Sequence, residues 1–486
     1  MPLTYPELNE IDGALTHTVK IARRPYPINL NDFPTMTLHT AADRLTFLQQ
    51  NGIRDVECIF ADISGYPRGK LMPAGKFAAG DELRIAQAIP MQAITGEYSY
   101  HAVFPDADPD VRLVPDYSTL KPVPWSSVPR AMAIHDCVEL VPERAGQLCE
   151  FAARSVLKNV VARYQARGWT PVVAPEIEFY LTSPNDDPSQ PLQAPVTRGG
   201  RAEVGQSAFS LNQLHEHAAF WNEFLPALDV LGIQSDTWIH EVGLTQFEIN
   251  LMHGDPVAVA DQAFLFKYAA KEIALKHSLN AVFMAKPIAG QPGSSMHLHQ
   301  SVIDTDGKNI FTGSNGDETP YFRQFIAGLQ CGIPELMLIY APHVNSFRRL
   351  VSGLQAPVNM HWGYDNRTLG LRVPGGSPAA RRVENRIAGS DANPYLAIAA
   401  SLAAGLWGIE NGASATEPMS GNAYLEGHGL PRTMLAALEL MEGSAVAGSL
   451  LGDRFVTAYT SVKKLEYENF LSEVSAWERR YLVPQA

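Results

Sequence analysis

The chain has few cysteines, a deficit of basic residues and no long apolar run, and each shortage excludes a class of protein. Its four cysteines, among 486 residues, lie far apart without a CxxC or Cys/His spacing, so the sequence predicts neither a zinc site nor a disulfide framework. Lysine and arginine number 38 against 51 aspartates and glutamates, which gives a net charge of −13. This balance argues against binding to nucleic acid or to an anionic membrane surface, because both need a basic footprint.

The hydrophobic content is that of a globular protein. Hydrophobic residues make up 46% of the chain and charged residues 18%, which excludes disorder and a coiled coil. The longest apolar stretch, Tyr395–Ile409, is too short for a membrane span and is interrupted by Ser401 and Gly405, so we predict a helix packed in a core. The first thirty residues contain no apolar segment of the kind that a signal peptide needs. We expect an acidic, cytoplasmic enzyme with reduced cysteines.

Composition along the chain predicts three parts. Residues 1–35 are rich in proline and polar residues, which indicates an irregular arm. Residues 36–140 combine a helix at 41–51 and a strand at 56–60 with a proline-rich series of short strands and loops, so we expect a strand-rich domain. Residues 141–486 alternate helices with antiparallel strands, and this pattern is typical of an α+β domain.

Hydrophobic periodicity predicts individual elements in the third part. The expected helices lie at 150–167, 211–231 and 257–277, and the expected strands at 171–181, 247–252, 282–285, 296–303 and 369–373. The segment 184–206 has almost no apolar period, so we expect a long surface loop there.

Acidic and histidine side chains recur on single faces of these strands. Glu176 and Glu178 are two residues apart, so both point to one face, and His297 and His299 share a face for the same reason. A solvated strand face is the ordinary alternative for any one of these groups. Together, however, five carboxylates and one imidazole suit two hard divalent cations, Mg²⁺ or Mn²⁺, as polyphosphate chemistry requires. The six candidate ligands are Glu176, Glu178, Glu241, Glu248, His297 and Glu384.

Arginines gather near the end of this series in an otherwise acidic chain. They are Arg348, Arg349, Arg367, Arg372, Arg381, Arg382 and Arg386. A surface basic patch is the alternative interpretation. Arg372, however, lies in an apolar strand, and Arg386 shares a strand face with Glu384. Planar guanidinium groups in such places fit bidentate recognition of phosphates and carboxylates.

Several motifs in a fixed order resemble the glutamine synthetase family, from about Val56 to about Asp453. They are Phe60-Ala61-Asp62 with Gly65 and Arg68-Gly69-Lys70, Arg112-Leu113-Val114-Pro115-Asp116, Lys286-Pro287, Gly293–Ser301, Asn345–Arg349, Asn366-Arg367 and Asp391–Leu396. The flanking sequence looks most like the branch that γ-glutamylates organic amines, such as the γ-glutamylpolyamine synthetases. The resemblance implies an N-terminal β-grasp domain, a catalytic domain with a curved antiparallel sheet flanked by helices, and a homo-oligomer, expected to be a dodecamer of two hexameric rings.

The resemblance also implies a reaction and roles for particular residues. The γ-carboxylate of L-glutamate would be phosphorylated by ATP, and an amine would then displace phosphate from the γ-glutamyl phosphate. One metal would lie among Glu178, Glu241 and Glu248, and a second among Glu176, His297 and Glu384. Glutamate would be bound by Gly293, Arg349 and Arg386; ATP or the transferring phosphate would be contacted by His299, Ser301, Arg367 and Arg372; and Arg367 and Gln355 would act in catalysis.

Departures from the family pattern concern the amine. Where ammonia-using members place an Asp, a Ser and a flap Glu, this sequence aligns Met91, Ile94 and Gln355, and Phe209 stands near the position of a pocket Tyr. An apolar pocket without an acid favours an apolar or aromatic monoamine such as an aniline, which is neutral at pH 7 and needs no base. A polyamine is the second candidate for the amine substrate, and ammonia is the third. A non-catalytic relative is disfavoured because all six ligands are present, so we expect an enzyme of amine catabolism.

Overall fold

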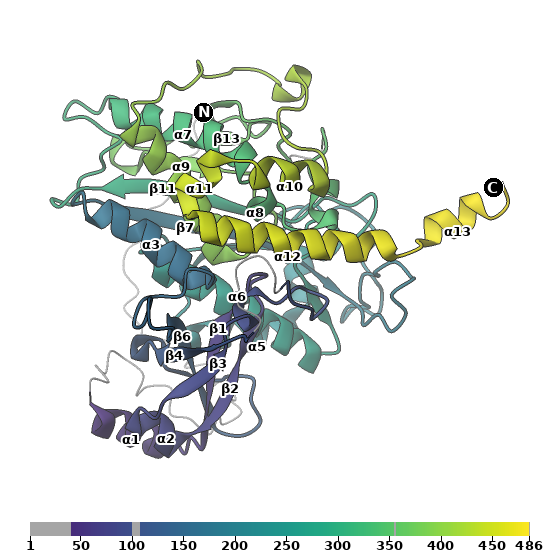
Figure 1. Cartoon of the computed structure of the whole chain (residues 1–486). Helices are drawn as coiled ribbons and strands as arrows, with labels where there is room; N and C mark the ends of the chain where they lie inside the picture. Colours follow the sequence, from purple (N-terminus) through teal and green to yellow (C-terminus); the bar gives the residue numbers. More distant parts are fainter. Residues whose placement is uncertain (1–39, 100–106, 354–355, 486) are drawn as a thin grey trace, which may run out of the picture.

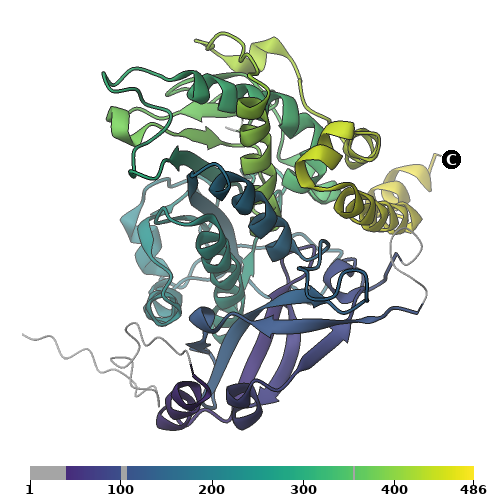
Figure 2. The same cartoon turned by 60° about the vertical axis from the view of Figure 1, so that its left-hand side comes forward.

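Two β-sheets organise the chain, and most of its helices pack around the second (Figure 1). The computed structural model describes residues 40–99, 107–353 and 356–485. The predicted irregular arm over residues 1–35 lies outside these residues. Figure 2 shows the N-terminal sheet, purple to blue, on one side of the molecule and the second sheet, teal to green, on the other.

The N-terminal sheet has six strands in the order β2-β1-β6-β4-β3, with β5 paired to β6. The bounds are β1 (Asp55–Ala61), β2 (Pro67–Pro73), β3 (Leu83–Ala86), β4 (Asp110–Pro115), β5 (Lys121–Pro122) and β6 (Arg130–Glu139). The pair β1 and β6 is parallel and the other pairs are antiparallel. Helices α1 (Ala41–Gln50) and α2 (Ala74–Ala79) bury Phe47, Leu48 and Phe77 in a core beside this sheet. The β-grasp assignment stays a prediction.

The second sheet has eight strands in the order β12-β13-β14-β11-β7-β9-β8, with β10 paired to β7. The bounds are β7 (Thr170–Thr182), β8 (Ser235–His240), β9 (Gln246–Leu251), β10 (Asn280–Val282), β11 (Met296–Ile303), β12 (Trp362–Tyr364), β13 (Leu371–Val373) and β14 (Val383–Asn385). Neighbouring strands are antiparallel except β12 and β13. The predicted α+β class with a mainly antiparallel sheet flanked by helices is confirmed.

Eleven further helices accompany this sheet in the described part of the chain. They are α3 (Ala153–Gln165), α4 (Leu211–Glu216), α5 (Ala218–Leu231), α6 (Pro256–Lys276), α7 (Pro320–Glu335), α8 (Met337–Tyr340), α9 (Pro394–Glu410), α10 (Met434–Glu442), α11 (Ala445–Leu451), α12 (Asp453–Ser472) and α13 (Ala476–Leu482). Within the described ranges, no single helix has the length and apolar character to cross a membrane; only the bent pair α10–α11 meets both criteria jointly.

The predicted core helix is confirmed as α9, which packs against α7 with the two backbones in close contact. A Cβ atom on Gly328 would lie 2.1 Å from the Ala404 carbonyl oxygen, and one on Gly408 would lie 2.1 Å from the Gln324 carbonyl oxygen. Only glycine allows this approach, because a side chain at either position would collide with backbone of the other helix.

Two predicted elements differ from the structure. The helix expected over 211–231 is divided at His217, which leaves helical geometry with φ −103° and ψ 26° and has a buried side chain against the Phe247 ring. The strand expected over 282–285 ends at Val282. It pairs with the end of β7 only, since β11 already occupies the same edge of β7 up to Ile177. Strand β8 was not predicted, because its polar residues show no alternation.

Arg154 of α3 ties the N-terminal sheet to the helices of the second part. Its guanidinium lies 2.7 Å from a carboxylate oxygen of Asp116, 2.8 Å from one of Asp136 and 2.7 Å from one of Asp261. Its side chain is 6% exposed, and those of Asp261, Asp136 and Asp116 are 10%, 14% and 28% exposed, so the pair with Asp261 is the most buried. Tyr395 of α9 also donates to Asp261. Asp116 and Asp136 belong to the first sheet region and Asp261 to α6, so one buried cation joins three segments.

Candidate active site

Strand register brings the predicted acidic residues together across the second sheet. Glu178 of β7 lies opposite Glu248 of β9, and Glu176 of β7 lies opposite His297 of β11. Glu384 enters from β14, the strand on the other side of β11. Opposed residues on one face of an antiparallel pair have neighbouring side chains. The alternation seen in the sequence therefore becomes contact between strands.

These side chains form two groups in which one ligand atom from each residue lies within 4.8 Å of the others. The three-glutamate cluster contains Glu178, Glu241 and Glu248, and the histidine cluster contains Glu176, His297 and Glu384. The grouping is the same as the two ligand sets that the family resemblance implies. Carboxylate oxygens with one imidazole are a donor set suited to Mg²⁺ or Mn²⁺.

The three-glutamate cluster concentrates negative charge with little compensation. Burial raises the pKa of Glu178 to about 7, and the charge of Glu241 adds to this rise. Burial likewise raises the pKa of Glu248 to about 9, together with the charge of Glu178. The Ser295 backbone N–H donates to Glu178 at 2.8 Å, which fixes the orientation of that carboxylate. A divalent cation would relieve this repulsion, so the cluster fits a metal.

The carboxylates of the histidine cluster are compensated by cationic neighbours. Glu384 accepts hydrogen bonds from Arg372 at 2.7 Å and from Arg386 at 2.5 Å. Burial raises the pKa of Glu384, but the charges of Arg386 and His297 outweigh burial and lower the pKa to about 2. Burial and the charge of Arg386 lower the pKa of His297 to about 4, so this imidazole is neutral at pH 7 and can act as a metal ligand.

The raised pKa values of Glu178 and Glu248 predict a stability that depends on both pH and metal. The unfolded carboxyls ionise near 4.5 and the folded ones near 7 and 9, so the folded metal-depleted chain holds protons that the unfolded chain has released. Stability without metal should therefore fall as pH rises through this window. Mg²⁺ or Mn²⁺ binds the ionised forms, so its stabilising effect should grow with pH.

Thermal unfolding with EDTA and with excess Mg²⁺, at about pH 6 and at about pH 9, measures this difference. We expect the shift in Tm caused by Mg²⁺ to be larger at the higher pH and to flatten in the Glu248→Gln variant. A shift that is equal at both pH values in the unsubstituted protein would contradict the assignment.

The three residues predicted to bind glutamate adjoin one another. Arg349 is buried and donates to the carbonyl oxygens of Arg386 at 2.8 Å and Ile387 at 2.9 Å. A Cβ atom on Gly293 would lie 2.6 Å from the Ala285 carbonyl oxygen and 2.6 Å from Arg349 Cγ. Glycine at this position is therefore required for Arg349 to pack where it does.

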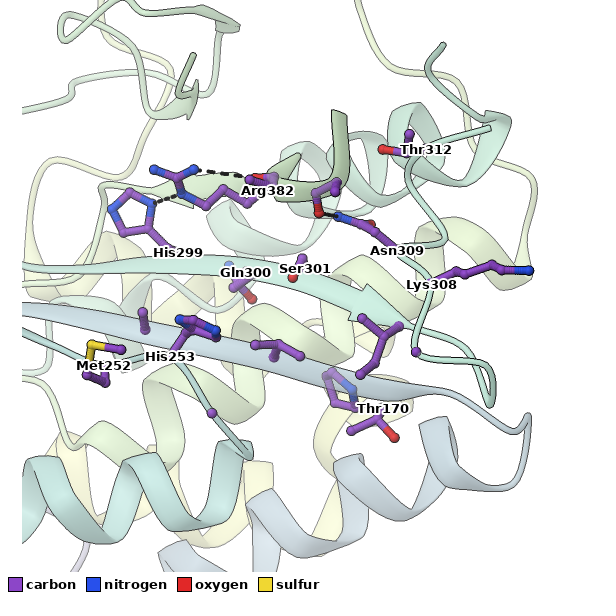
Figure 3. A pocket seen from close by; sticks show the side chains of 18 of the residues that line it. Thr170, Met252, His253, His299, Gln300, Ser301, Lys308, Asn309, Thr312 and Arg382 are labelled. Carbon is purple, nitrogen blue, oxygen red and sulfur yellow. Dashed lines mark hydrogen bonds between the residues drawn. The ribbon is translucent and has the colours of Figure 1, made fainter. Parts of the chain in front are cut away.

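A cavity of about 1390 Å³ opens beside the histidine cluster (Figure 3). His299 and Arg382 lie at one end and Lys308 and Thr312 at the other, with Ser301 on the strand between them (Figure 3). The volume exceeds that of typical sites for drug-sized ligands, so a nucleoside triphosphate fits.

Arg382 fixes the orientation of His299. Arg382 Nε donates to His299 Nδ1 at 3.1 Å, so a neutral His299 carries its proton on Nε2. That nitrogen then donates to Glu176 Oε1 at 2.8 Å. Hydrogen bonds from His297 and His299 outweigh burial and hold the pKa of Glu176 far below its ordinary value.

Two further candidates for phosphate binding and catalysis, Arg372 and Arg367, lie near carboxylates of the same clusters. Arg372 donates to Glu384 and, at 3.1 Å, to Asp365. Burial raises the pKa of Glu241, and the charge of Arg367 opposes this rise, so the exposed Arg367 side chain lies near that carboxylate. Gln355 falls outside the described residues.

The three predicted amine-pocket residues that the structure describes differ in burial. Met91 is 1% exposed and packs in the hydrophobic core, so it presents no open surface. Ile94 is 59% exposed, and its backbone N–H donates to Glu466 of α12. Phe209 is 72% exposed, and its backbone N–H donates to the carbonyl oxygen of His240 at 2.8 Å. Since His240 directly precedes Glu241, the backbone of Phe209 lies beside the segment that carries Glu241.

Sequence reasoning missed Gln246 and gave Arg382 no specific role. Gln246 donates to the Gly293 carbonyl oxygen at 3.0 Å and to Glu178 at 3.4 Å, so it links the three-glutamate cluster to the glycine. It is two residues from Glu248, so strand alternation was a usable signal. Arg382 was noted among the arginines, but its contact with His299 depends on strand pairing between distant segments.

The sheet with two acidic ligand clusters, adjoining arginines and a large cavity is the site of an enzyme suited to divalent metals. Residues 150–482 match the family model described as "Glutamine synthetase, catalytic domain". The chain is 34% identical to a glutamate–isopropylamine ligase of Pseudomonas sp, over 90% of this chain and 96% of the relative. It is 33% identical to the γ-glutamylputrescine synthetase of Escherichia coli strain K12, over 86% and 90%. The chain therefore belongs to the glutamine synthetase family.

Further comparisons agree with this assignment. The γ-glutamylethanolamide synthetase of Streptomyces coelicolor is 33% identical over 76% of this chain and 78% of that protein. A solved structure described as a "GmaS/ADP complex" has a TM-score of 0.77 and 28% identity, and covers 91% of this chain and 99% of that chain. The prediction of a glutamine synthetase relative from the glutamate–amine ligase branch is confirmed, and the chain is an enzyme of the ligase class.

Proposed function

We propose that the enzyme joins the γ-carboxylate of L-glutamate to an organic amine at the expense of ATP. The observation that carries this proposal is the position of Glu176 and Glu178, two residues apart on one face of β7. One belongs to the cluster beside the nucleotide-sized cavity, and the other to the cluster beside Gly293 and Arg349. A phosphate donor and an amino acid bound at these two places would meet across a single strand face.

The proposed reaction has two steps. An oxygen of the γ-carboxylate attacks the terminal phosphorus of ATP, the bond to the β,γ-bridging oxygen breaks, and ADP leaves. The amine nitrogen then attacks the γ-carbon, phosphate leaves with the carboxylate oxygen, and the nitrogen loses a proton to solvent. Divalent metal held by the two clusters would neutralise charge on the phosphates.

The chain's own residues would orient these reactants. Arg349 and Gly293 shape the amino acid end, as their mutual packing indicates. Arg367 and Arg372 lie near the carboxylates of the two clusters and would offset charge on the transferring phosphoryl group. Arg382 holds His299 against Glu176 at the mouth of the cavity.

For the amine, we propose an apolar or aromatic monoamine. Phe209 lies beside the segment that carries Glu241, and two neighbours of Phe209 in the chain, Val204 and Leu211, are 92% and 70% exposed. Exposed apolar side chains of this kind gain about 25 cal/mol for each Å² that a hydrocarbon ligand covers. The relative named for isopropylamine supports this choice. The relatives named for putrescine and ethanolamide supply the alternative amines.

Steady-state rates of phosphate release with isopropylamine, an aniline, putrescine, ethanolamine and ammonium test the amine. We expect kcat/KM for the better apolar monoamine to exceed that for ammonium at least about 10-fold, because burying a hydrocarbon group contributes about 1.5–3 kcal/mol. The Phe209→Ala variant should reduce this ratio. A highest kcat/KM with ammonium or putrescine would contradict the apolar proposal.

We also propose a homo-oligomer, with the dodecamer as the expected form. Helix α13 extends away from the rest of the molecule at the C-terminal end (Figure 1). The segment from the end of α12 exposes Phe470, Leu471, Val474, Trp477, Tyr481, Leu482 and Val483. An apolar segment of this kind is suited to packing on a second copy.

Sedimentation of the full chain should show a large assembly, and a chain ending at Glu473 should show smaller species. A stable, active full-length monomer would contradict the proposed homo-oligomer.

A cytoplasmic location completes the proposal. Cys58, Cys137 and Cys149 are buried, Cys331 is exposed, and all four are free thiols. Free thiols are usual in a reducing compartment.

A further inference from the structure

Three buried polar residues near the segment that carries Glu241 belong to neither ligand set. Glu203 comes from the long loop that precedes α4, His217 separates α4 from α5, and His240 ends β8. These residues are 8%, 6% and 0% exposed, respectively. Buried groups of this polarity are costly unless they are hydrogen-bonded, so their contacts need an explanation.

Glu203 contacts both ends of one short segment. Its Oε2 atom accepts from the Thr245 backbone N–H at 2.7 Å and lies 3.1 Å from His240 Nε2. The residues between these two partners are 241–244, which together with Thr245 form the connection from β8 to β9. A single carboxylate oxygen therefore closes this connection across its base.

The backbone of the connection needs such support. Thr245 has φ +55°, a left-handed conformation that is unfavourable for a β-branched residue. Its hydroxyl donates to the Leu181 carbonyl oxygen at 2.6 Å, so the residue is held from two directions. Glu203 supplies the hydrogen bond that satisfies the amide of this strained residue.

The same connection carries a candidate metal ligand. Glu241 directly follows His240, and its backbone N–H donates to the Gln246 carbonyl oxygen at 2.8 Å. Gln246 directly follows Thr245, and its side chain contacts Glu178 and the Gly293 carbonyl oxygen. Both partners of Glu203 are thus chain neighbours of residues in the site.

The loop that holds Glu203 also holds Phe209, which donates its backbone N–H to the His240 carbonyl oxygen. In the described part of the chain, Glu203 Oε1, His217 Nε2 and His240 Nδ1 are buried without a hydrogen-bond partner. Apolar residues of similar volume would fill this space at little cost or with a gain, so packing alone does not account for the polar groups. Their hydrogen bonds to the connection do, since these orient it.

We propose that Glu203 is a positioning residue that sets the geometry of Glu241 and thereby couples the Phe209 loop to metal binding in the three-glutamate cluster. This inference rests on the proposed function in assigning that cluster to a divalent cation. The proposal predicts a selective effect: substitution of Glu203 should weaken Mn²⁺ binding at the three-glutamate cluster and leave Mn²⁺ binding at the histidine cluster unchanged.

Mn²⁺ binding to the full chain without substrates, followed by electron paramagnetic resonance, tests the proposal. Glu248→Gln and Glu384→Gln first assign the two classes of binding site. Glu203→Leu leaves the Thr245 N–H and His240 without their acceptor, and should weaken Mn²⁺ binding at the three-glutamate cluster at least about 10-fold, as loss of an outer-shell partner does. Glu203→Gln keeps an acceptor for the Thr245 N–H, so its Mn²⁺ affinity at the three-glutamate cluster should lie between those of the unsubstituted chain and Glu203→Leu.

The matched control is Glu216→Leu, in the helix that follows the same loop. Glu216 accepts from the Gly199 N–H at 2.9 Å and from the Thr197 hydroxyl at 2.6 Å, so it also holds loop backbone, but within the described residues the hydrogen bonds of its carboxylate all go to residues 197–199. The Glu216→Leu variant should bind Mn²⁺ at both clusters as tightly as the unsubstituted chain does.

A folded Glu203→Leu chain with unchanged Mn²⁺ affinity at the three-glutamate cluster, or with equal losses at both clusters, would overturn the proposal. If that variant does not fold, Glu203→Gln decides alone, since a loss below about 3-fold at the three-glutamate cluster would then overturn it. Failure of the proposed function looks different: the unsubstituted enzyme would release no phosphate in response to an amine, whatever its Mn²⁺ binding.

Discussion

Replacing Glu178 with glutamine should lower kcat for amine ligation at least about 1000-fold, which corresponds to about 4 kcal/mol of transition-state stabilisation. Glutamine keeps the shape of the side chain and can still accept the Ser295 N–H, so the strand should remain in place. What is lost is the charge that, together with Glu241 and Glu248, defines the three-glutamate cluster. Phosphate release at saturating ATP, glutamate and amine measures the loss.

Glu384→Gln should lower kcat as much as Glu178→Gln does, but it should affect the use of a different substrate. Glu384 accepts from Arg372 and Arg386 in the histidine cluster beside the cavity, so its loss should mainly impair use of ATP, whereas loss of Glu178 should mainly impair positioning of glutamate. Glu216→Gln, a carboxylate outside both clusters, is the control and should retain activity. Near-normal rates for both cluster variants at saturating Mg²⁺ would show that the two-metal assignment is wrong.

Replacing Arg154 with methionine should lower the free energy of unfolding by about 3–5 kcal/mol. The guanidinium holds Asp116, Asp136 and Asp261, and its removal leaves the buried Asp261 carboxylate without its cation, whereas Asp136 keeps Lys158 at 2.5 Å. Burial already raises the pKa of Asp261, and hydrogen bonds from Arg154 oppose that rise. Without Arg154 the Asp261 carboxyl would take up a proton more readily, so the variant should lose less stability at low pH than at neutral pH.

Arg163→Met is the matched control for this measurement. Arg163 lies in the same helix, and its ion pair with Glu410 is 33% and 25% exposed. A pair of this kind contributes about 0–1 kcal/mol. Chemical denaturation of both variants gives the comparison, and equal losses for Arg154→Met and Arg163→Met would refute the role assigned to the buried network.

The ligand clusters could be predicted from sequence because strand alternation and motif order agree. Glu176 and Glu178 had to share a face, and the pairing of β7 with β9 and β11 then placed Glu248 and His297 beside them. That pairing itself is not a local property: His297 follows Glu176 by 121 residues. The sequence therefore indicated the ligands, and the family resemblance supplied their grouping.

The residues proposed to contact the amine were harder to predict, because they lie in loops without a periodic pattern. Met91 and Ile94 are three residues apart, yet one is in the core and the other is exposed, and no periodic pattern separates them. Glu203 lies in a polar loop without apolar period, so nothing local distinguishes its buried carboxylate from the exposed acids around it. The division of the predicted helix at His217 has the same origin, since a contact with β9 decides it.

Oxygen transfer from glutamate to phosphate tests the central claim most directly. The unsubstituted enzyme would be supplied with ATP, an apolar monoamine and glutamate labelled with ¹⁸O in its γ-carboxylate, and the products analysed by mass spectrometry. We expect one ¹⁸O in each phosphate released and one molecule of γ-glutamyl amide for each ADP, because the carboxylate oxygen that attacks phosphorus leaves with it. Unlabelled phosphate, or ADP formed without the amide, would contradict the account.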